Sequence, residues 1–142
     1  MILGLGTDLC DIRRVEQTLR RFGERFALRL FTDTERVKAA RRPHKSAQVF
    51  AQCFAAKEAC AKALGTGYRR GVFARDIAVA NHPSGRPYLT LHGGARRRLD
   101  EMTPPGMVAQ IDLSLSDEKP MAHAVVIISA VPASRTVVGE VA

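Results

Sequence analysis

Hydrophobic residues in the first half of the chain recur mainly at the spacing of helix faces. After Asp11 they mark one face of a predicted helix, at Ile12, Val15, Leu19 and Phe22. Gly23 breaks this pattern, and a further helical turn is predicted over 26–30. The segment 32–35, Thr-Asp-Thr-Glu, matches a capping box, so a third helix is predicted from there towards Arg41.

The strongest helical pattern begins at Ser46. Its apolar positions form a stripe with alanines in the gaps, and Gly65 is placed to end the helix as a C-cap. The sequence therefore predicts one long helix, preceded by shorter ones.

Strand-like patterns occur at the N-terminus and in the second half of the chain. Residues 2–7 predict a short buried strand that ends at Asp8, and its two glycines indicate close backbone approach or a bulge. Residues 77–80 and 88–91 flank a turn segment and predict a β-hairpin. The remaining predicted elements are a short basic helix over 94–102 and strands over 108–115 and 124–131.

Together these elements predict an α+β fold in which a mainly antiparallel sheet packs around the long helix. With 142 residues, the chain is long enough for one core without disulfide support, and it shows no internal repeat or domain boundary. The single domain is placed at residues 1–131. The small, polar tail over 132–142 is expected to fray.

Composition and charge narrow the class of protein. No apolar run approaches the ~18 residues of a membrane span, and the N-terminus lacks the basic region of a signal peptide. We therefore expect a cytoplasmic protein with no membrane partner. The cysteines, Cys10, Cys53 and Cys60, are odd in number and lack C-x-x-C spacing, which argues against a disulfide framework or a zinc site. The net charge of +8 indicates an anionic partner, whether nucleic acid, phosphorylated ligand or acidic protein.

Three segments place polar residues at the ends of predicted elements. Asp8 suits a hard-cation ligand, or it is simply the N-cap of the next helix. Glu58 and Lys62 share one helix face: Glu58 could bind a metal or accept a proton while Lys62 stabilises phosphate charge, or the two form a surface salt bridge. The backbone of 65–67, Gly-Thr-Gly, could contact a phosphate. The segment 114–118, Ser-Leu-Ser-Asp-Glu, is a third candidate, although a turn also explains it.

In this order, the segments resemble the holo-acyl-carrier-protein synthases, small single-domain members of the phosphopantetheinyl transferase superfamily. The matching residues span roughly 1–130 and include 4–8 (Gly-Leu-Gly-Thr-Asp), 54–59 (Phe-Ala-Ala-Lys-Glu-Ala), 62–67, 85–87 (Gly-Arg-Pro) and 114–116. The resemblance implies the 4′-phosphopantetheinyl transferase fold. It also implies an enzyme of fatty-acid and lipid metabolism that moves the 4′-phosphopantetheine arm from coenzyme A to a serine of acyl carrier protein. This reaction uses Mg²⁺ and releases 3′,5′-ADP.

The resemblance further implies roles for individual residues. Asp8 and Glu58 match the metal ligands, and Glu58 and Lys62 match catalytic residues, Lys62 lying near the diphosphate. Coenzyme A contacts are implied for Lys62, Gly65, Thr66, Gly67, Pro87, Ser116 and Asp117. The acidic carrier would dock on arginines of the first helical region, Arg14, Arg21 and Arg25, unless these form a solvated face with no partner. Family members resemble trimers with active sites between protomers, so a homotrimer is expected.

Two positions depart from the family pattern. Cys53 stands where the family often has arginine, and Asp117 stands where many members have histidine. An ionised aspartate cannot donate to a phosphate as histidine can. A degenerate member that binds coenzyme A or a carrier without transfer is therefore an alternative. A basic nucleic-acid-binding module is another, but the chain has few aromatic residues and no tryptophan, so no nucleic-acid partner is expected.

Overall fold

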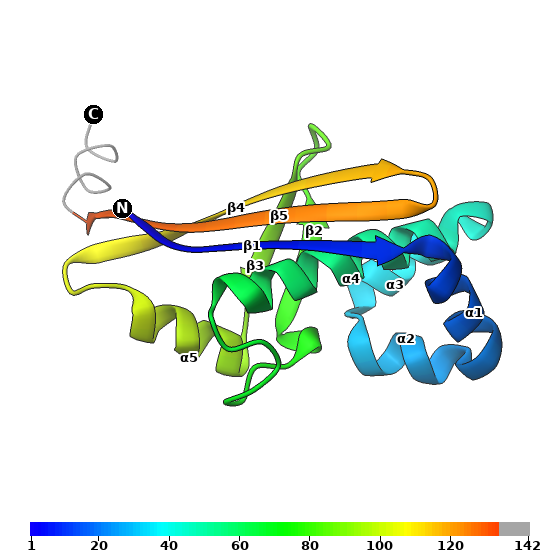
Figure 1. Ribbon diagram of the computed structural model, residues 1–142, viewed down its shortest axis with the longest axis horizontal. Coiled ribbons are helices and arrows are strands. Elements are labelled where there is room, and N and C mark those ends of the chain that lie inside the picture. Colours follow the sequence, from blue (N-terminus) through cyan, green and yellow to red (C-terminus); the bar gives the residue numbers. More distant parts are fainter. Residues whose placement is uncertain (134–142) are drawn as a thin grey trace.

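Three strands form the main sheet, in the order β1 (Ile2–Asp11), β5 (Met121–Pro132) and β4 (Met107–Glu118), with antiparallel neighbours. The long helix α4 (Ser46–Ala63) packs against one face of this sheet (Figure 1). The computed structural model describes residues 1–133. The α+β prediction is confirmed, although the hairpin strands form a second, separate antiparallel sheet.

The other elements lie towards the two ends of α4 (Figure 1). One end is covered by α1 (Ile12–Phe22), α2 (Glu24–Leu30) and α3 (Asp33–Ala40). The hairpin and the last helix follow α4 in sequence, as β2 (Ile77–Asn81), β3 (Pro87–Leu91) and α5 (Gly93–Met102). The predicted helices and the hairpin are confirmed. Pro132 completes β5 rather than opening a frayed tail, and the predicted tail from 134 onwards lies outside the described residues.

β1 is longer and less buried than predicted. The strand continues past Asp8 to Asp11, and Leu5 and Leu9 on its outer face are 64% and 63% exposed. The prediction of a buried strand is wrong because helix α4 covers only one face of the sheet. β1 is also an edge strand, so its second long side is uncovered.

The two glycines of β1 allow the strand to approach α4 closely, as predicted. A Cβ on Gly4 would lie 2.0 Å from the carbonyl oxygen of Ala63, and one on Gly6 would lie 1.8 Å from that of Ala59. Real Cβ atoms do not tolerate such distances, so a larger residue would push the strand off the helix. The close approach brings the following residues of β1 against the C-terminal half of α4.

Side chains of the expected types cap the first and third helices. Asp11 caps α1 by accepting from the backbone N–H of Arg13 at 2.9 Å, so the N-cap interpretation of Asp8 is wrong. Thr32 and Glu35 form the predicted capping box at the start of α3. Phe22, which the helical spacing places on the same face as Val15, is the last residue of α1 and is 48% exposed.

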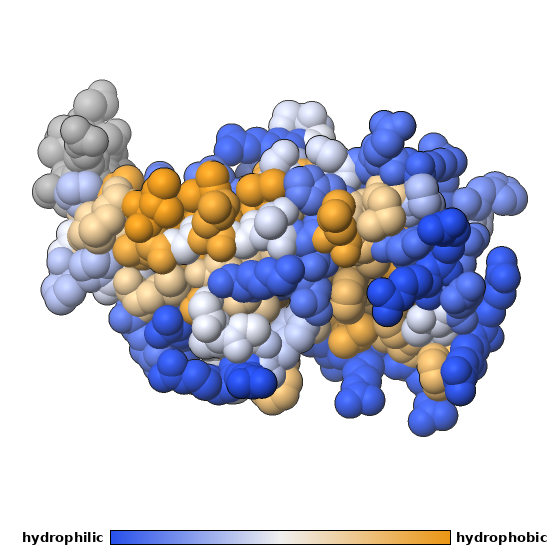
Figure 2. All heavy atoms as spheres, in the orientation of Figure 1, coloured by the Kyte–Doolittle hydropathy of each residue, from blue (hydrophilic) through white to orange (hydrophobic). Residues whose placement is uncertain are grey.

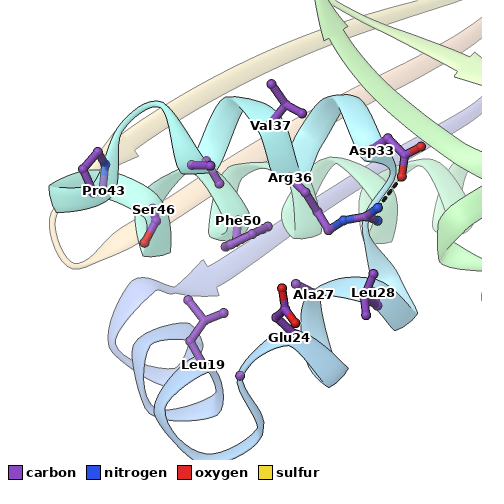
Figure 3. Close-up of a pocket in the computed structure, with 13 residues that line it drawn as sticks. Leu19, Glu24, Ala27, Leu28, Asp33, Arg36, Val37, Pro43, Ser46 and Phe50 are labelled. Carbon is purple, nitrogen blue, oxygen red and sulfur yellow. Dashed lines mark hydrogen bonds and ion pairs between the residues drawn. The ribbon is translucent and has the colours of Figure 1, made fainter.

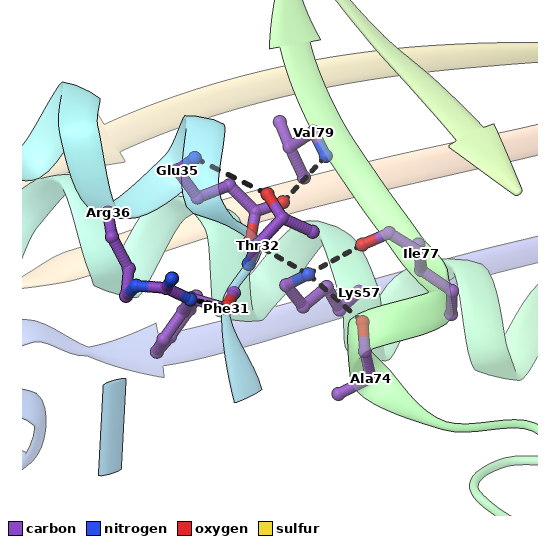
Figure 4. Close-up of polar contacts among 8 residues, drawn as sticks. All are labelled: Phe31, Thr32, Glu35, Arg36, Lys57, Ala74, Ile77 and Val79. Carbon is purple, nitrogen blue, oxygen red and sulfur yellow. Dashed lines mark hydrogen bonds and ion pairs between the residues drawn. The ribbon is translucent and has the colours of Figure 1, made fainter. Parts of the chain in front are cut away.

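A buried ion pair joins α3, α4 and β2 (Figure 4). Lys57 Nζ lies 2.9 Å from Glu35 Oε1 and also donates to the carbonyl oxygens of Ala74 and Ile77, at 3.0 and 2.5 Å. The second carboxylate oxygen of Glu35 accepts from the backbone N–H of Val79 at 2.7 Å. Every polar group of the pair thus has a partner, which offsets the desolvation of two charges.

Candidate active site

Asp8 and Lys62 meet where β1 crosses the C-terminal half of α4. Lys62 Nζ lies 3.1 Å from Asp8 Oδ1 and donates to the carbonyl oxygen of Thr7 at 3.0 Å. Asp8 lies on the same face of β1 as Gly4 and Gly6, the face that touches the helix. The glycine-rich strand therefore delivers a partly buried carboxylate to an exposed lysine on α4.

Glu58 completes this cluster from the turn of α4 that precedes Lys62. Burial raises the pKa of Glu58, and the nearby Asp8 carboxylate raises it further, whereas Lys62 and a hydrogen bond from Tyr68 lower it. The effect of the Asp8 charge on Glu58 indicates that the two carboxylates lie in one environment. Lys62 forms its ion pair with Asp8, so the predicted surface salt bridge between Glu58 and Lys62 is wrong.

Tyr68 is a residue of this cluster that sequence reasoning missed. It lies beside Glu58: burial raises the pKa of the tyrosine, and the negative charge of Glu58 raises it further. The feature of the sequence that could have indicated Tyr68 is its position immediately after the Gly-Thr-Gly segment, which ends at Gly67. A neutral hydroxyl at this point can hold one orientation of the Glu58 carboxylate.

The donor set of the cluster fits Mg²⁺ and does not fit a structural zinc site. Within residues 1–133, no group of three or more histidine, cysteine, aspartate or glutamate side chains converges to hold a metal. Mg²⁺ usually takes one or two carboxylates and completes its shell with water and substrate phosphates. Asp8 and Glu58 provide that number of carboxylates. Burial and then the charge of Asp8 raise the pKa of Glu58, and a bound cation would offset both effects.

The loop after α4 uses its glycine amides to end the helix. The N–H of Gly65 donates to the carbonyl oxygen of Lys62 at 2.9 Å, and the N–H of Gly67 donates to that of Ala61 at 3.1 Å. Both glycines have positive φ, +77° and +58°, which only glycine adopts without strain. These two amides are thus not available to a phosphate, while Thr66 donates its hydroxyl to the carbonyl of Gly67.

Pro87, Ser116 and Asp117 lie apart from this cluster. β4, which carries Ser116 and Asp117, is the edge strand opposite β1, and β5 separates the two by roughly 10 Å in total. Asp117 Oδ2 accepts from Gln48 at 2.6 Å, and Oδ1 accepts from Gln52. Pro87 begins β3, which contacts β4. A single copy of the chain therefore does not bring the predicted coenzyme A residues together.

Cys53 cannot replace the phosphate contact of an arginine. Its side chain is 3% exposed within the core, and burial raises the pKa of the thiol to about 12. Cys10 and Cys60 are likewise buried free thiols. All three cysteines thus serve as small hydrophobic residues of the core.

The arginines predicted to receive the carrier are exposed on α1 and α2. Arg14 borders a small hollow of about 170 Å³ whose walls include Val15, Phe26 and Phe54. Arg25 borders a second hollow between α1 and α2. This face therefore combines exposed positive charge with apolar depressions.

A further cavity, of about 650 Å³, opens between the first four helices (Figure 3). Leu19, Leu28, Val37 and Phe50 form its apolar walls, and the ion pair of Arg36 with Asp33 lies at its rim. No residue of the Asp8 cluster lines it. The cavity is thus separate from the candidate active site.

Among the described residues, no helix is both long and apolar enough to cross a bilayer.

A family model described as the 4′-phosphopantetheinyl transferase superfamily matches residues 4–108, a range that contains Asp8, Glu58 and Lys62. The chain belongs to this superfamily. The holo-acyl-carrier-protein synthase of Rhodopseudomonas palustris (strain BisB5) is 57% identical to it over 137 residues, covering 94% of this chain and 99% of the relative.

Solved structures agree with this assignment. The holo-acyl-carrier-protein synthase of Neisseria meningitidis superposes with a TM-score of 0.80 at 34% identity, covering 91% of this chain and 99% of that chain. The Helicobacter pylori enzyme, solved in complex with coenzyme A, gives a TM-score of 0.74 at 29% identity, covering 88% and 99%. All three relatives are named as holo-acyl-carrier-protein synthases.

Proposed function

We propose that this chain transfers the 4′-phosphopantetheine arm of coenzyme A to a serine of an apo-acyl carrier protein and releases 3′,5′-ADP. The main observation in favour of this function is that Asp8, Glu58 and Lys62 lie together between β1 and α4. Its relatives named as holo-acyl-carrier-protein synthases, one of them in complex with coenzyme A, support the same reaction.

Each residue of the cluster has a role in this reaction. Glu58 accepts the proton of the carrier serine, whose oxygen attacks the phosphorus that bears the pantetheine arm. The bond from this phosphorus to the bridging oxygen breaks, and the electron pair leaves with 3′,5′-ADP. Lys62 stabilises the negative charge that develops on the leaving phosphate.

Asp8 and Glu58 are the residues that would hold Mg²⁺. The bound cation would neutralise diphosphate charge and orient the phosphates. Lys62, paired with Asp8 at 3.1 Å, restrains the aspartate carboxylate in the position from which it would bind the cation.

The complete site is proposed to lie between copies of the chain in a homotrimer. Pro87, Ser116 and Asp117 are candidate coenzyme A contacts, but they lie across the sheet from Lys62. A neighbouring copy that placed its β4 edge beside the Asp8 cluster would complete the site. A site shared between copies would account for the separation, within one chain, of the residues that match the family's active site.

The outer face of the main sheet supports this assembly. Apolar side chains gather along β1 and the adjoining part of the sheet (Figure 2). Ile2, Leu5 and Leu9 on β1 are more than 60% exposed, and Val108 on β4 is 41% exposed. An apolar sheet face of this kind is typical of an interface that excludes water.

Arg14, Arg21 and Arg25 are proposed as the docking face for the acidic carrier. Exposed positive charge would steer an acidic partner, and the apolar hollows beside Arg14 and Arg25 would accept its side chains. We place the reaction in the cytoplasm, because three free buried thiols suit a reducing compartment.

The test is a mass measurement of apo-carrier after incubation with the protein, coenzyme A and Mg²⁺. We expect the carrier to gain one phosphopantetheine on its serine and to gain none when that serine is replaced by alanine. Glu58→Gln should abolish the gain, whereas Glu24→Gln, which neutralises an exposed acid on α2, should not. If the folded, unaltered protein leaves the carrier unmodified, the transfer function is wrong. The remaining hypothesis would then be a protein that binds coenzyme A or a carrier without transferring the arm.

A further inference from the structure

Lys62 is held by two contacts with β1 rather than by its own helix. Its Nζ lies 3.1 Å from Asp8 Oδ1 and donates to the carbonyl oxygen of Thr7 at 3.0 Å. Among the ion pairs of residues 1–133, this is the one pair that involves Asp8. The ammonium therefore neutralises a carboxylate that is proposed to bind the divalent cation.

Of the two partners in this pair, the lysine is the one that can move. Its side chain is 53% exposed, whereas that of Asp8 is 16% exposed. Asp8 is fixed by its strand, which pairs with β5 at Ala124 and touches α4 through Gly6. Lysine carries its charge on a flexible four-carbon stem, so the ammonium can leave Asp8 without any movement of the backbone.

The contacts of the ammonium with β1 compete with its proposed role in the reaction. Of its three N–H donors, one is directed to Asp8 and another to Thr7. In the proposed reaction, the same group stabilises the charge that develops on the leaving phosphate. Contacts with the phosphate would therefore have to replace those with β1, at least in part.

The ammonium also competes with a cation for the Asp8 carboxylate. Because Lys62 already lies against this carboxylate, a divalent cation bound there would meet a like charge at short range. Such repulsion is strong in a partly buried site, where water screens charges less than in bulk solvent. If the ammonium turned to the diphosphate of coenzyme A, it would leave this repulsion and gain charge-assisted hydrogen bonds to phosphate oxygens.

We propose that Lys62 is a switch that couples the binding of coenzyme A to that of the divalent cation. Before coenzyme A binds, the ammonium neutralises Asp8 and opposes the cation. The diphosphate of coenzyme A then draws the ammonium away, and Asp8 becomes free to bind the cation tightly. This inference rests on the proposed function. It adds that one lysine opposes the cation in the absence of the substrate and serves the substrate once it is bound.

The test is a Mn²⁺ titration followed by electron paramagnetic resonance, which reports binding without turnover. Mn²⁺ takes the same oxygen ligands as Mg²⁺. Without coenzyme A, Lys62→Met should bind Mn²⁺ about tenfold more tightly than the unaltered protein, an ordinary size for coupling between sites. Saturating coenzyme A should raise the Mn²⁺ affinity of the unaltered protein about tenfold more than that of the variant. Working at about pH 7.5 keeps Glu58 ionised although its pKa is raised.

Two further variants locate the effect at Asp8. Lys38→Met removes a partly exposed lysine of α3 that donates to Asn81, and it should leave the Mn²⁺ affinity unchanged. In an Asp8→Asn background, Lys62→Met should no longer tighten Mn²⁺ binding, because the carboxylate for which the two cations compete is gone.

Three results would overturn the proposal. They are unchanged or weaker Mn²⁺ binding by Lys62→Met without coenzyme A, tightening that persists in the Asp8→Asn background, and an equal gain from coenzyme A in both proteins. If the unaltered protein leaves the carrier unmodified, the proposed function fails. The Mn²⁺ titration without coenzyme A still decides in that case whether Lys62 opposes a cation at Asp8.

Discussion

Lys57 Nζ lies 2.9 Å from Glu35 Oε1, and neither side chain is exposed to solvent. Lys57 immediately precedes Glu58, so this buried pair fixes the turn of α4 that carries the proposed base. α3 and β2 hold the pair from outside the helix, through Glu35 and through the carbonyl oxygen of Ile77. The position of Glu58 thus depends on contacts in the core.

Lys57→Met should destabilise the protein by about 3–5 kcal/mol, because it leaves the buried Glu35 carboxylate without its counter-ion. The measurement is urea unfolding, followed by circular dichroism. Lys38→Met is the control: Lys38 is a partly exposed lysine that donates to Asn81, and its loss should cost about 0.5 kcal/mol or less. Equal stability of the two variants would show that the buried pair has no net effect.

Glu58→Gln should lower kcat by about 10²–10⁴-fold, because the amide can neither accept the serine proton nor ligate a cation with full charge. The measurement is the initial rate of carrier modification at saturating Mg²⁺ and coenzyme A. Thermal unfolding of the variant should be unchanged or slightly improved, since Glu58 is partly desolvated. A near-normal kcat would remove Glu58 from the mechanism.

The pKa of Glu58 in the metal-free protein should lie above its ordinary value of 4.5, because burial and the Asp8 charge both disfavour the ionised form. Asp8→Asn should lower this pKa by removing a negative charge. Lys62→Met should raise it by removing a positive one, so that Glu58 loses its charge at a higher pH as the solution is acidified. Carbon-13 NMR titration of the carboxyl group measures all three. Shifts of the same sign in both variants would contradict the shared environment of Asp8 and Glu58.

Arg14→Glu and Arg21→Glu should raise KM for the carrier strongly at low salt and less at high salt, because the Debye length falls from ~10 Å at 0.1 M to ~3 Å at 1 M. KM for coenzyme A should hardly change. Lys119→Glu, which reverses a charge between β4 and β5, controls for net charge. If carrier KM is unaffected at low salt, the docking face lies elsewhere, and the basic side chains between Arg36 and Lys45 become the next candidates.

Leu5→Asp should dissociate the proposed homotrimer, because it places a charge on the apolar outer face of the sheet, where Leu5 is 64% exposed in the single chain. Light scattering should report a monomer, and transfer activity should fall together with assembly. Leu28→Asp, a change at a half-exposed leucine on α2, should leave the assembly intact. A fully active monomer at assay concentration would show that one chain holds a complete site.

The sequence by itself determined the elements that depend on near neighbours. The capping box at Thr32 and Glu35, the break at Gly23 and the long helix from Ser46 all follow from interactions within a few residues. The identity of Asp8, Glu58 and Lys62 as candidate site residues also came from sequence. Local chemistry and residue order suffice for these conclusions.

Only the tertiary structure decided which of these side chains meet. Lys62 pairs with Asp8, 54 residues away, rather than with Glu58 on its own helix face. Asp117 is bound by Gln48, 69 residues away. These partners depend on where β1 and β4 lie against α4, and in β1 that distance is set by the missing side chains of Gly4 and Gly6. Periodicity along a chain carries no information about how these elements pack together, because their packing arises from contacts between surfaces that are distant in sequence.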